Sequence, residues 1–212
     1  MGTIRGAIFD LDGVIVDTAK YHYRAWKRLA QSLGFDFTER DNERLKGVSR
    51  IRSLEILLEV GGIQVDPEVR ELMAEEKNRW YVEYLETLDS SALLPGAREY
   101  LEYLGRAGVP VALGSASKNA RLILERLGIT SLFDAIIDGS CVSRAKPDPE
   151  VFLKGAEAMS LKPAECMVFE DSLAGIQAAK SCGLYAGGVA SPEILPGAAQ
   201  KTPPACRVHN HR

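Results

Sequence analysis

The sequence predicts an α/β fold, in which a parallel β-sheet carries helices on both faces and a helical segment is inserted early in the chain. Three observations support it. Residues 6–9 form a short apolar run that ends at Asp10. Residues 17–88 then show helical spacing without a convincing strand. From residue 94 onward, helical and strand patterns alternate, as expected for a parallel sheet.

The first run, residues 6–9, is a candidate buried strand because it is apolar throughout and is broken by Gly13. The insertion follows it. Apolar residues from Tyr23 to Leu33 recur at spacings of three and four, and Asp66-Pro67 is a good helix start, with Asp as cap and Pro in the first turn. We therefore expect a small helical domain in this part of the chain.

The second half of the chain predicts the rest of the sheet. Glycines end the expected helices, and a ligand site is expected at the carboxyl ends of the strands. The expected strands are 109–114, 135–137, 166–169 and 185–189, and the expected helices are 98–106, 119–127, 149–158 and 173–182.

Composition narrows the class of protein. The chain has 212 residues, of which 26 are Lys or Arg and 29 are Asp or Glu. It therefore lacks the excess of basic residues that would suggest a nucleic-acid partner. No stretch approaches the length of a membrane span, and no signal region precedes the first acidic residues. The cysteines fit no zinc pattern and are expected to be reduced and buried; they are Cys141, Cys166, Cys182 and Cys206. We expect a cytoplasmic monomer.

Polar clusters follow the candidate strands. They are Asp10-Leu11-Asp12, Ser115-Ala116-Ser117 and Glu170-Asp171, and Lys146 lies in a loop between the last two. In a parallel sheet these ends meet at one edge. Four carboxylates there would repel each other, which a divalent cation relieves, and oxygen ligands favour Mg²⁺.

This set of side chains suits phosphoryl transfer. A carboxylate can act as nucleophile and form an acyl phosphate, and a second carboxylate two residues later can move protons. A metal and Lys146 would neutralise the phosphoryl charge, and Ser115 and Ala116 could hold its remaining oxygens. Each residue alone has a plainer interpretation: Asp171 as a helix cap, Lys146 as a surface lysine, the serines as loop residues. Their convergence favours a site.

These motifs resemble the four motifs of the haloacid dehalogenase (HAD) superfamily: FDLDGVIVDT, Ser115 in SAS, Lys146-Pro147 and Glu170-Asp171, over roughly residues 8–189. The resemblance implies a Rossmann-like core at 1–16 and 93–190 with a helical cap at 17–92. It implies Asp10 as nucleophile, Asp12 as general acid and base, and phosphoryl contacts from Ser115 and Lys146. It also implies Mg²⁺ held by Asp10, Glu170, Asp171 and the backbone carbonyl of Asp12. The dehalogenase branch lacks an acid at the position of Asp12.

Within that superfamily the sequence is similar to the β-phosphoglucomutase family, through DTAKYHYRAW, LKGVSR, Lys77-Asn78, SASKN and EDSLAGIQA. A mutase needs a second anion site, which Arg50 could form with residues 117–119. Arg50 could also be an exposed helix-start residue, and His22 a structural histidine. The resemblance implies that the substrate side is lined by Thr18, His22, Trp26, Lys46, Gly47, Val48, Ser49, Arg50, Lys77, Ala116, Ser117, Lys118 and Asn119.

The expected activity is interconversion of β-D-glucose 1-phosphate and glucose 6-phosphate through phospho-Asp10, with glucose 1,6-bisphosphate as phosphorylating activator. A sugar-phosphate phosphatase, with water as acceptor, is the alternative, and a non-enzymatic binding protein is disfavoured by the intact acidic residues. Residues 14–16 and 88–94 are expected to connect core and cap, whose closure would exclude water. The tail at 191–212 departs from the family, and we expect it to be poorly ordered and to reduce stability.

Overall fold

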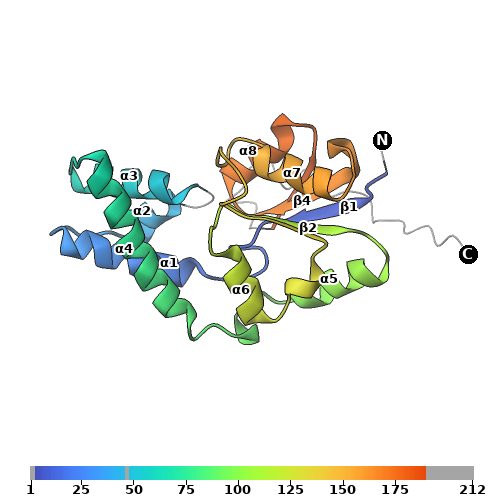
Figure 1. Cartoon of the computed structure of the whole chain (residues 1–212), viewed down its shortest axis with the longest axis horizontal. Helices are drawn as coiled ribbons and strands as arrows, with labels where there is room; N and C mark the ends of the chain where they lie inside the picture. Colours follow the sequence, from blue (N-terminus) through green and yellow to red (C-terminus); the bar gives the residue numbers. More distant parts are fainter. Residues whose placement is uncertain (1–2, 46–47, 190–212) are drawn as a thin grey trace, which may run out of the picture.

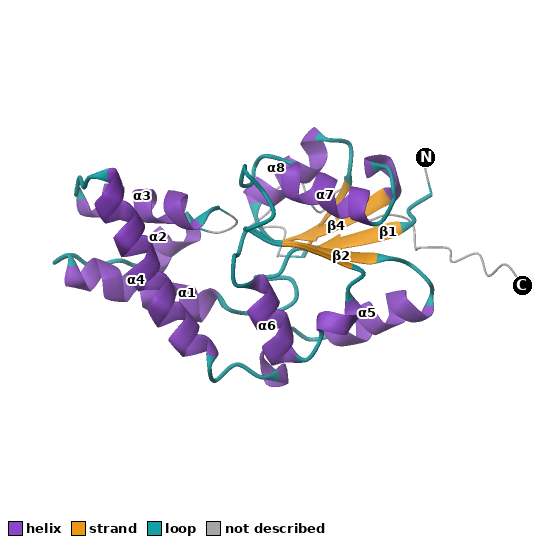
Figure 2. Ribbon diagram, viewed as in Figure 1, coloured by secondary structure: helices purple, strands orange, loops and turns teal. Residues whose placement is uncertain are grey.

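The computed structural model describes residues 3–45 and 48–189 of the chain. Its centre is a five-stranded, fully parallel sheet in the order β3-β2-β1-β4-β5 (Figures 1 and 2). All five predicted strands are present, with ends that differ by two residues or fewer. They are β1 (Gly6–Phe9), β2 (Val111–Gly114), β3 (Ala135–Ile137), β4 (Cys166–Glu170) and β5 (Tyr185–Gly188).

Helices cover both faces of the sheet because successive strand residues point to opposite sides. Ile8 and Val168 are buried with residues of α7 and α8, whereas Ala7 and Phe9 are buried with residues of α5 and α6. Figure 1 shows the first helix pair above the strands and the second below. These helices are α5 (Ala97–Arg106), α6 (Ala120–Leu127), α7 (Glu150–Ala158) and α8 (Leu173–Ser181). The predicted α/β fold class is confirmed.

Helices α1 to α4 form a separate layer beside the sheet, inserted between β1 and β2 (Figure 2). Trp26 and Leu29 on α1 are buried, as their spacing predicts, and α1 packs mainly against α4. Pro67 opens α4 after Asp66, but the Asp66 side chain makes no capping hydrogen bond with the described residues. The helices are α1 (Ala19–Ser32), α2 (Glu39–Glu43), α3 (Arg50–Gly61) and α4 (Pro67–Leu85), and short 3₁₀ turns follow at Ser90–Ala92, Thr130–Leu132 and Pro163–Glu165.

Two chain segments join this helical layer to the sheet, and they pair with each other. Val16 bridges Asp12 in parallel and Leu93 in antiparallel fashion, and the Leu94 amide donates to the Ile15 carbonyl at 2.9 Å. Both expected connections, residues 14–16 and 88–94, contribute to this pairing. The domain limits 1–16, 17–92 and 93–190 stay a prediction.

Some expectations fall on residues whose positions are not described. They are Lys46 and Gly47 of the LKGVSR segment, and the tail at 191–212 with Cys206. Among the described helices, none combines the length and the apolar character that crossing a membrane requires.

Candidate active site

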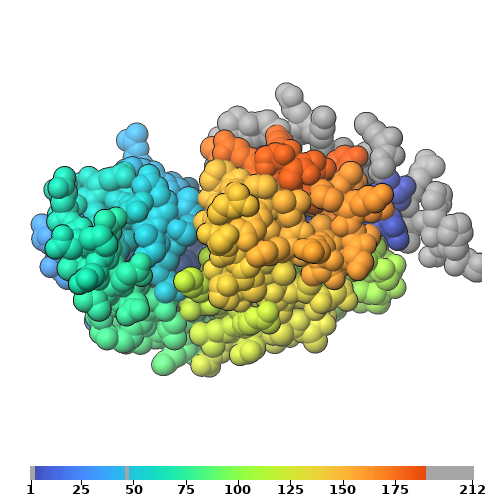
Figure 3. Space-filling model, turned by 45° about the horizontal axis from the view of Figure 1, so that its top comes forward, coloured from blue at the N-terminus to red at the C-terminus, as the bar shows by residue number. Residues whose placement is uncertain are grey.

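The carboxyl ends of the strands face helices α1, α3 and α4 across a cavity of about 540 Å³. In the space-filling view the helical layer lies directly beside the sheet layer (Figure 3). Asp10, Asp12 and Asp171 line the sheet side of this cavity, and Arg50 and Lys77 line the helical side. One cavity therefore brings together carboxylates and cations from both layers.

Asp10 follows β1 directly and is 6% exposed. The Lys146 ammonium lies between two carboxylates, 2.5 Å from Asp10 Oδ1 and 2.8 Å from Glu170 Oε2. Burial is the main reason why the pKa of Asp10 is raised well above its ordinary value, and Lys146 opposes this. Burial acts to lower the pKa of Lys146, but the two carboxylates outweigh it and raise that pKa. Lys146 is thus a buried cation, and the alternative interpretation as a surface lysine is wrong.

Asp10, Glu170 and Asp171 form an acidic cluster in which one oxygen of each lies within 4.8 Å of the others. Glu170 Oε1 accepts from Ser172 N at 3.0 Å and from Ser172 Oγ at 2.7 Å. Three oxygen donors so close together fit a divalent cation, whose charge would offset their repulsion. The side chain of Asp12 lies outside this cluster, and only its backbone carbonyl was expected to contribute.

The start of α8 decides whether Asp171 is a helix cap or a carboxylate of the site. Ser172 is the N-cap of α8, and its Oγ accepts from the Gly175 amide at 3.1 Å. Asp171 therefore does not cap this helix, and its carboxylate belongs to the acidic cluster. Two glycines leave room for these acids. A Cβ at Gly13, where φ is +81°, would overlap the Asp171 carboxylate, and one at Gly175 would overlap that of Glu170.

Asp12 is placed to exchange protons. The Thr18 hydroxyl donates a hydrogen bond to Asp12 Oδ1 and fixes its orientation. Burial, followed by the nearby Asp171 charge, raises the pKa of Asp12 to about 7, while Lys146 and Lys77 act in the opposite direction. A carboxyl group with a pKa near neutrality can both donate and accept a proton at physiological pH.

On the helical side, Lys77 is 2% exposed, and its ammonium lies 2.9 Å from His22 Nδ1 and 4.4 Å from the centre of the Trp26 ring. Burial, together with the Arg50 charge, lowers the pKa of Lys77. His22 stacks on Tyr81 with ring centres 4.0 Å apart. Tyr81 is not among the predicted site residues, although its position four residues after Lys77 puts both on one helical face.

A second polar loop follows β2. Ser115 is buried, and its Oγ accepts from the Ser117 amide at 3.1 Å. Asn119 Nδ2 donates to Asn78 Oδ1 of α4 at 2.8 Å, which links the two layers. Thr18 reaches the site through Asp12. The predicted residues that line the cavity, besides the acids, are His22, Trp26, Val48, Ser49, Arg50, Lys77, Ser115, Ala116, Ser117, Lys118, Asn119 and Lys146.

Comparisons with known proteins agree with this geometry. The family model of haloacid dehalogenase-like hydrolases matches residues 4–183. A β-phosphoglucomutase of Bacillus subtilis is 43% identical over 198 residues, covering 92% of this chain and 87% of that protein. A phosphorylated carbohydrates phosphatase of Thermotoga maritima is 35% identical, covering 85% and 82%.

Among solved structures, a β-phosphoglucomutase of Clostridium difficile superimposes with a TM-score of 0.88 at 42% identity, covering 92% of this chain and 88% of that one. Because this likeness covers 92% of the chain, it extends over both layers. The chain belongs to the haloacid dehalogenase-like hydrolase family and, within it, to the branch of the β-phosphoglucomutases.

Proposed function

We propose that this enzyme is a phosphomutase that interconverts β-D-glucose 1-phosphate and D-glucose 6-phosphate. The observation that carries the proposal is the cavity itself, which has a nucleophilic carboxylate at one end and the Arg50 guanidinium on the opposite wall. The relatives add weight, since the β-phosphoglucomutase of B. subtilis is more similar to this chain than the carbohydrate phosphatase of T. maritima.

The chemistry follows from the positions of Asp10 and Asp12. Phosphorylated Asp10 transfers its phosphoryl group to the 6-oxygen of glucose 1-phosphate, and Asp12 accepts the proton of that hydroxyl. The bisphosphate then turns round, an oxygen of Asp10 attacks the 1-phosphoryl group, and the bond from phosphorus to the sugar oxygen breaks. Asp12 returns its proton to the departing 1-oxygen, which leaves glucose 6-phosphate and phospho-Asp10.

Lys146 orients Asp10 and places positive charge beside the oxygens of the transferring group. Asp10, Glu170, Asp171 and the backbone carbonyl of Asp12 would hold Mg²⁺, which when bound supplies further positive charge at the phosphoryl oxygens. Ser115, with the backbone amide of Ala116, would bind the same group.

The distal phosphate would lie against Arg50, with Ser117, Lys118 and Asn119 as further donors. The sugar would lie between the two phosphates, against His22, Trp26, Val48, Ser49 and Lys77, with Thr18 holding Asp12. Lys46 and Gly47 keep their predicted place in this set.

A two-product assay tests the proposal. The protein receives β-glucose 1-phosphate, Mg²⁺ and a trace of glucose 1,6-bisphosphate, and glucose 6-phosphate and free phosphate are followed in parallel. We expect glucose 6-phosphate with little free phosphate, and neither product with Asp10→Asn. Free phosphate alone would make the protein a phosphatase, the alternative that relatives such as the T. maritima enzyme support. Neither product from the folded wild type would refute both activities for this sugar.

Arg50→Ala tests the distal phosphate site. Loss of its charged hydrogen bonds, worth about 1.5–3 kcal/mol, should lower mutase activity by roughly 10- to 100-fold. Hydrolysis of p-nitrophenyl phosphate, which has no second phosphate, should change by less than about threefold. Arg52→Ala is the matched control, because Arg52 lies on the same helix and is paired with Glu55 and Glu59. Equal losses in both assays would contradict a distal site at Arg50.

A further inference from the structure

Lys146 lies in the connection between β3 and α7, residues 138–149, all of which is described and none of which is helix or strand. Its ammonium must nevertheless stay within hydrogen-bonding distance of Asp10 and Glu170. An irregular segment samples several conformations unless side chains or backbone contacts fix it. The loop therefore needs contacts that hold it in place.

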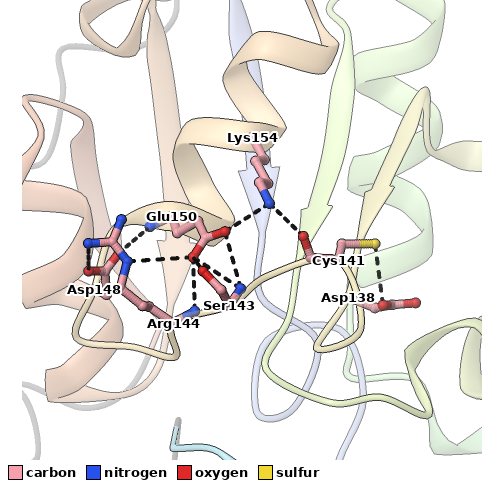
Figure 4. Close-up of polar contacts among 7 residues, drawn as sticks. All are labelled: Asp138, Cys141, Ser143, Arg144, Asp148, Glu150 and Lys154. Carbon is pink, nitrogen blue, oxygen red and sulfur yellow. Dashed lines mark hydrogen bonds and ion pairs between the residues drawn. The ribbon is translucent and has the colours of Figure 1, made fainter.

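Glu150, the first residue of α7, accepts several hydrogen bonds from this loop at its carboxylate (Figure 4). Glu150 Oε2 accepts from the Ser143 hydroxyl at 2.9 Å and from the Arg144 amide at 2.9 Å, and the Ser143 amide donates to both oxygens at 3.1 and 3.2 Å. The Lys154 ammonium, one helical turn later, lies 2.8 Å from Glu150 Oε1 and donates to the Cys141 carbonyl at 2.6 Å.

These contacts bind the loop rather than the helix. Apart from Lys154, the groups that donate to Glu150 belong to Ser143 and Arg144, three and two residues before Lys146 respectively. The carboxylate is largely shielded, with its side chain 13% exposed, whereas the nearby Arg144 is 70% exposed. The hydrogen bond from Lys154, followed by those from Ser143 and Arg144, lowers the pKa of Glu150 to about 2.

Helix α7 also contacts the side chain of Lys146. Phe152, two residues after Glu150, is fully buried, and its ring centre lies 4.7 Å from Lys146 Nζ. The start of α7 therefore fixes the backbone before Lys146 and supplies the surface on which its ammonium rests. A displacement of about 1 Å at a reacting group can cost about 10²-fold in rate.

We propose that Glu150 is a positioning residue for Lys146: it ties the 138–149 loop to α7 and so keeps the ammonium between Asp10 and Glu170. The proposal rests on the proposed function, in which Lys146 orients the nucleophile and neutralises charge. Glu150 itself neither lines the cavity nor belongs to the acidic cluster.

Glu150→Gln tests it, because the amide keeps the size of the side chain but turns one acceptor into a donor that opposes the loop amides. We expect kcat for the mutase reaction to fall about 10²-fold while KM changes by less than about threefold. Glu157→Gln is the matched control, an exposed glutamate on the same helix. Lys154→Met, on a side chain that is 40% exposed, is a milder second variant and should lower kcat in the same direction.

A double-mutant cycle separates positioning from general damage to the fold. In a Lys146→Met background there is no ammonium to position, so adding Glu150→Gln should change the residual kcat by less than about twofold. The same large loss in both backgrounds would overturn the proposal, as would a Glu150→Gln enzyme with wild-type kcat.

Chemical labelling gives a readout that does not depend on turnover. In metal-free protein, acetic anhydride should modify the buried Lys146 slowly relative to the exposed Lys180, as measured by peptide mass spectrometry. Glu150→Gln should raise the rate of Lys146 modification relative to that of Lys180 about tenfold. This is the effect expected if the hydrogen bonds that hold the loop lose about 1.4 kcal/mol. An unchanged ratio would overturn the proposal even in a protein that is not a mutase. If the wild type has no mutase activity but Glu150→Gln still shows the expected labelling change, only the proposed function is refuted.

Discussion

At the scale of single residues, the acidic cluster depends on space as much as on charge. Glu170 is fully buried, and its carboxylate lies where a side chain at position 175 of α8 would begin. Glycine usually weakens a helix by about 1 kcal/mol relative to alanine. At Gly175 that cost is offset by the room it leaves for a carboxylate beside Lys146.

Gly175→Ala should therefore destabilise the protein, by roughly 1–3 kcal/mol, because the new methyl group overlaps the Glu170 carboxylate. Thermal or urea unfolding of the metal-free protein measures it. Gly105→Ala is the control: Gly105 is also helical, and apart from its chain neighbours and its own helix backbone no described atom lies within 4 Å of its Cβ position. That variant should be neutral or more stable by up to about 1 kcal/mol. Equal stability of the two variants would mean that Glu170 moves aside without cost.

At the scale of elements, the contact between α1 and α4 buries two basic side chains against each other. His22 of α1 faces Lys77 and Tyr81 of α4, and Arg50 of α3 adds a second positive charge. Burial first, and then these two cations, lower the pKa of His22 well below its ordinary value of 6.5. The packing of these helices therefore requires a neutral imidazole.

The contribution of His22 to stability should consequently fall in mildly acidic solution, whereas Asp12, whose pKa is raised, contributes with the opposite sign. Below about pH 6.5 the unfolded chain binds a proton at His22 that the folded chain excludes, so unfolding is favoured by up to about 1.4 kcal/mol per pH unit. Above that pH the effect is absent. Urea unfolding from pH 7.5 to 5.5 should show that His22→Gln removes this slope. Asp12 titrates in both proteins, so the difference between them isolates His22. Parallel pH profiles would contradict the expected shift.

The elements also show why part of the fold could be predicted from sequence. Strands and helices were found because apolar periodicity and glycine breaks are local signals, and Lys146 and Asp171 were placed at one edge because parallel strands end together. The order of the strands could not be predicted in this way, because it depends on contacts between distant segments. The stacking of Tyr81 on His22 and the support of Lys146 by Phe152 were missed for the same reason. The expected place of Lys77 on the substrate side followed from the family resemblance alone.

At the scale of the whole molecule, the sheet and the helical layer are joined in two ways. The paired connections around Val16 and Leu93 are the covalent links between the layers. Across the cavity, the hydrogen bond from Asn119 to Asn78 joins the layers without a covalent link. A phosphomutase must hold these layers together while phospho-Asp10 exists, because water that reaches the acyl phosphate ends the cycle.

Asn78→Ala should therefore shift the partition of the phosphoenzyme from sugar to water. Losing one hydrogen bond worth about 1 kcal/mol should raise the ratio of free phosphate to glucose 6-phosphate roughly fivefold in the two-product assay. Arg79→Ala is the control, since Arg79 is the next residue of α4, is 65% exposed and pairs with Glu76 of the same helix. An unchanged ratio, with slower formation of both products, would mean that Asn78 acts on substrate binding through Asn119 and that its hydrogen bond does not keep water out.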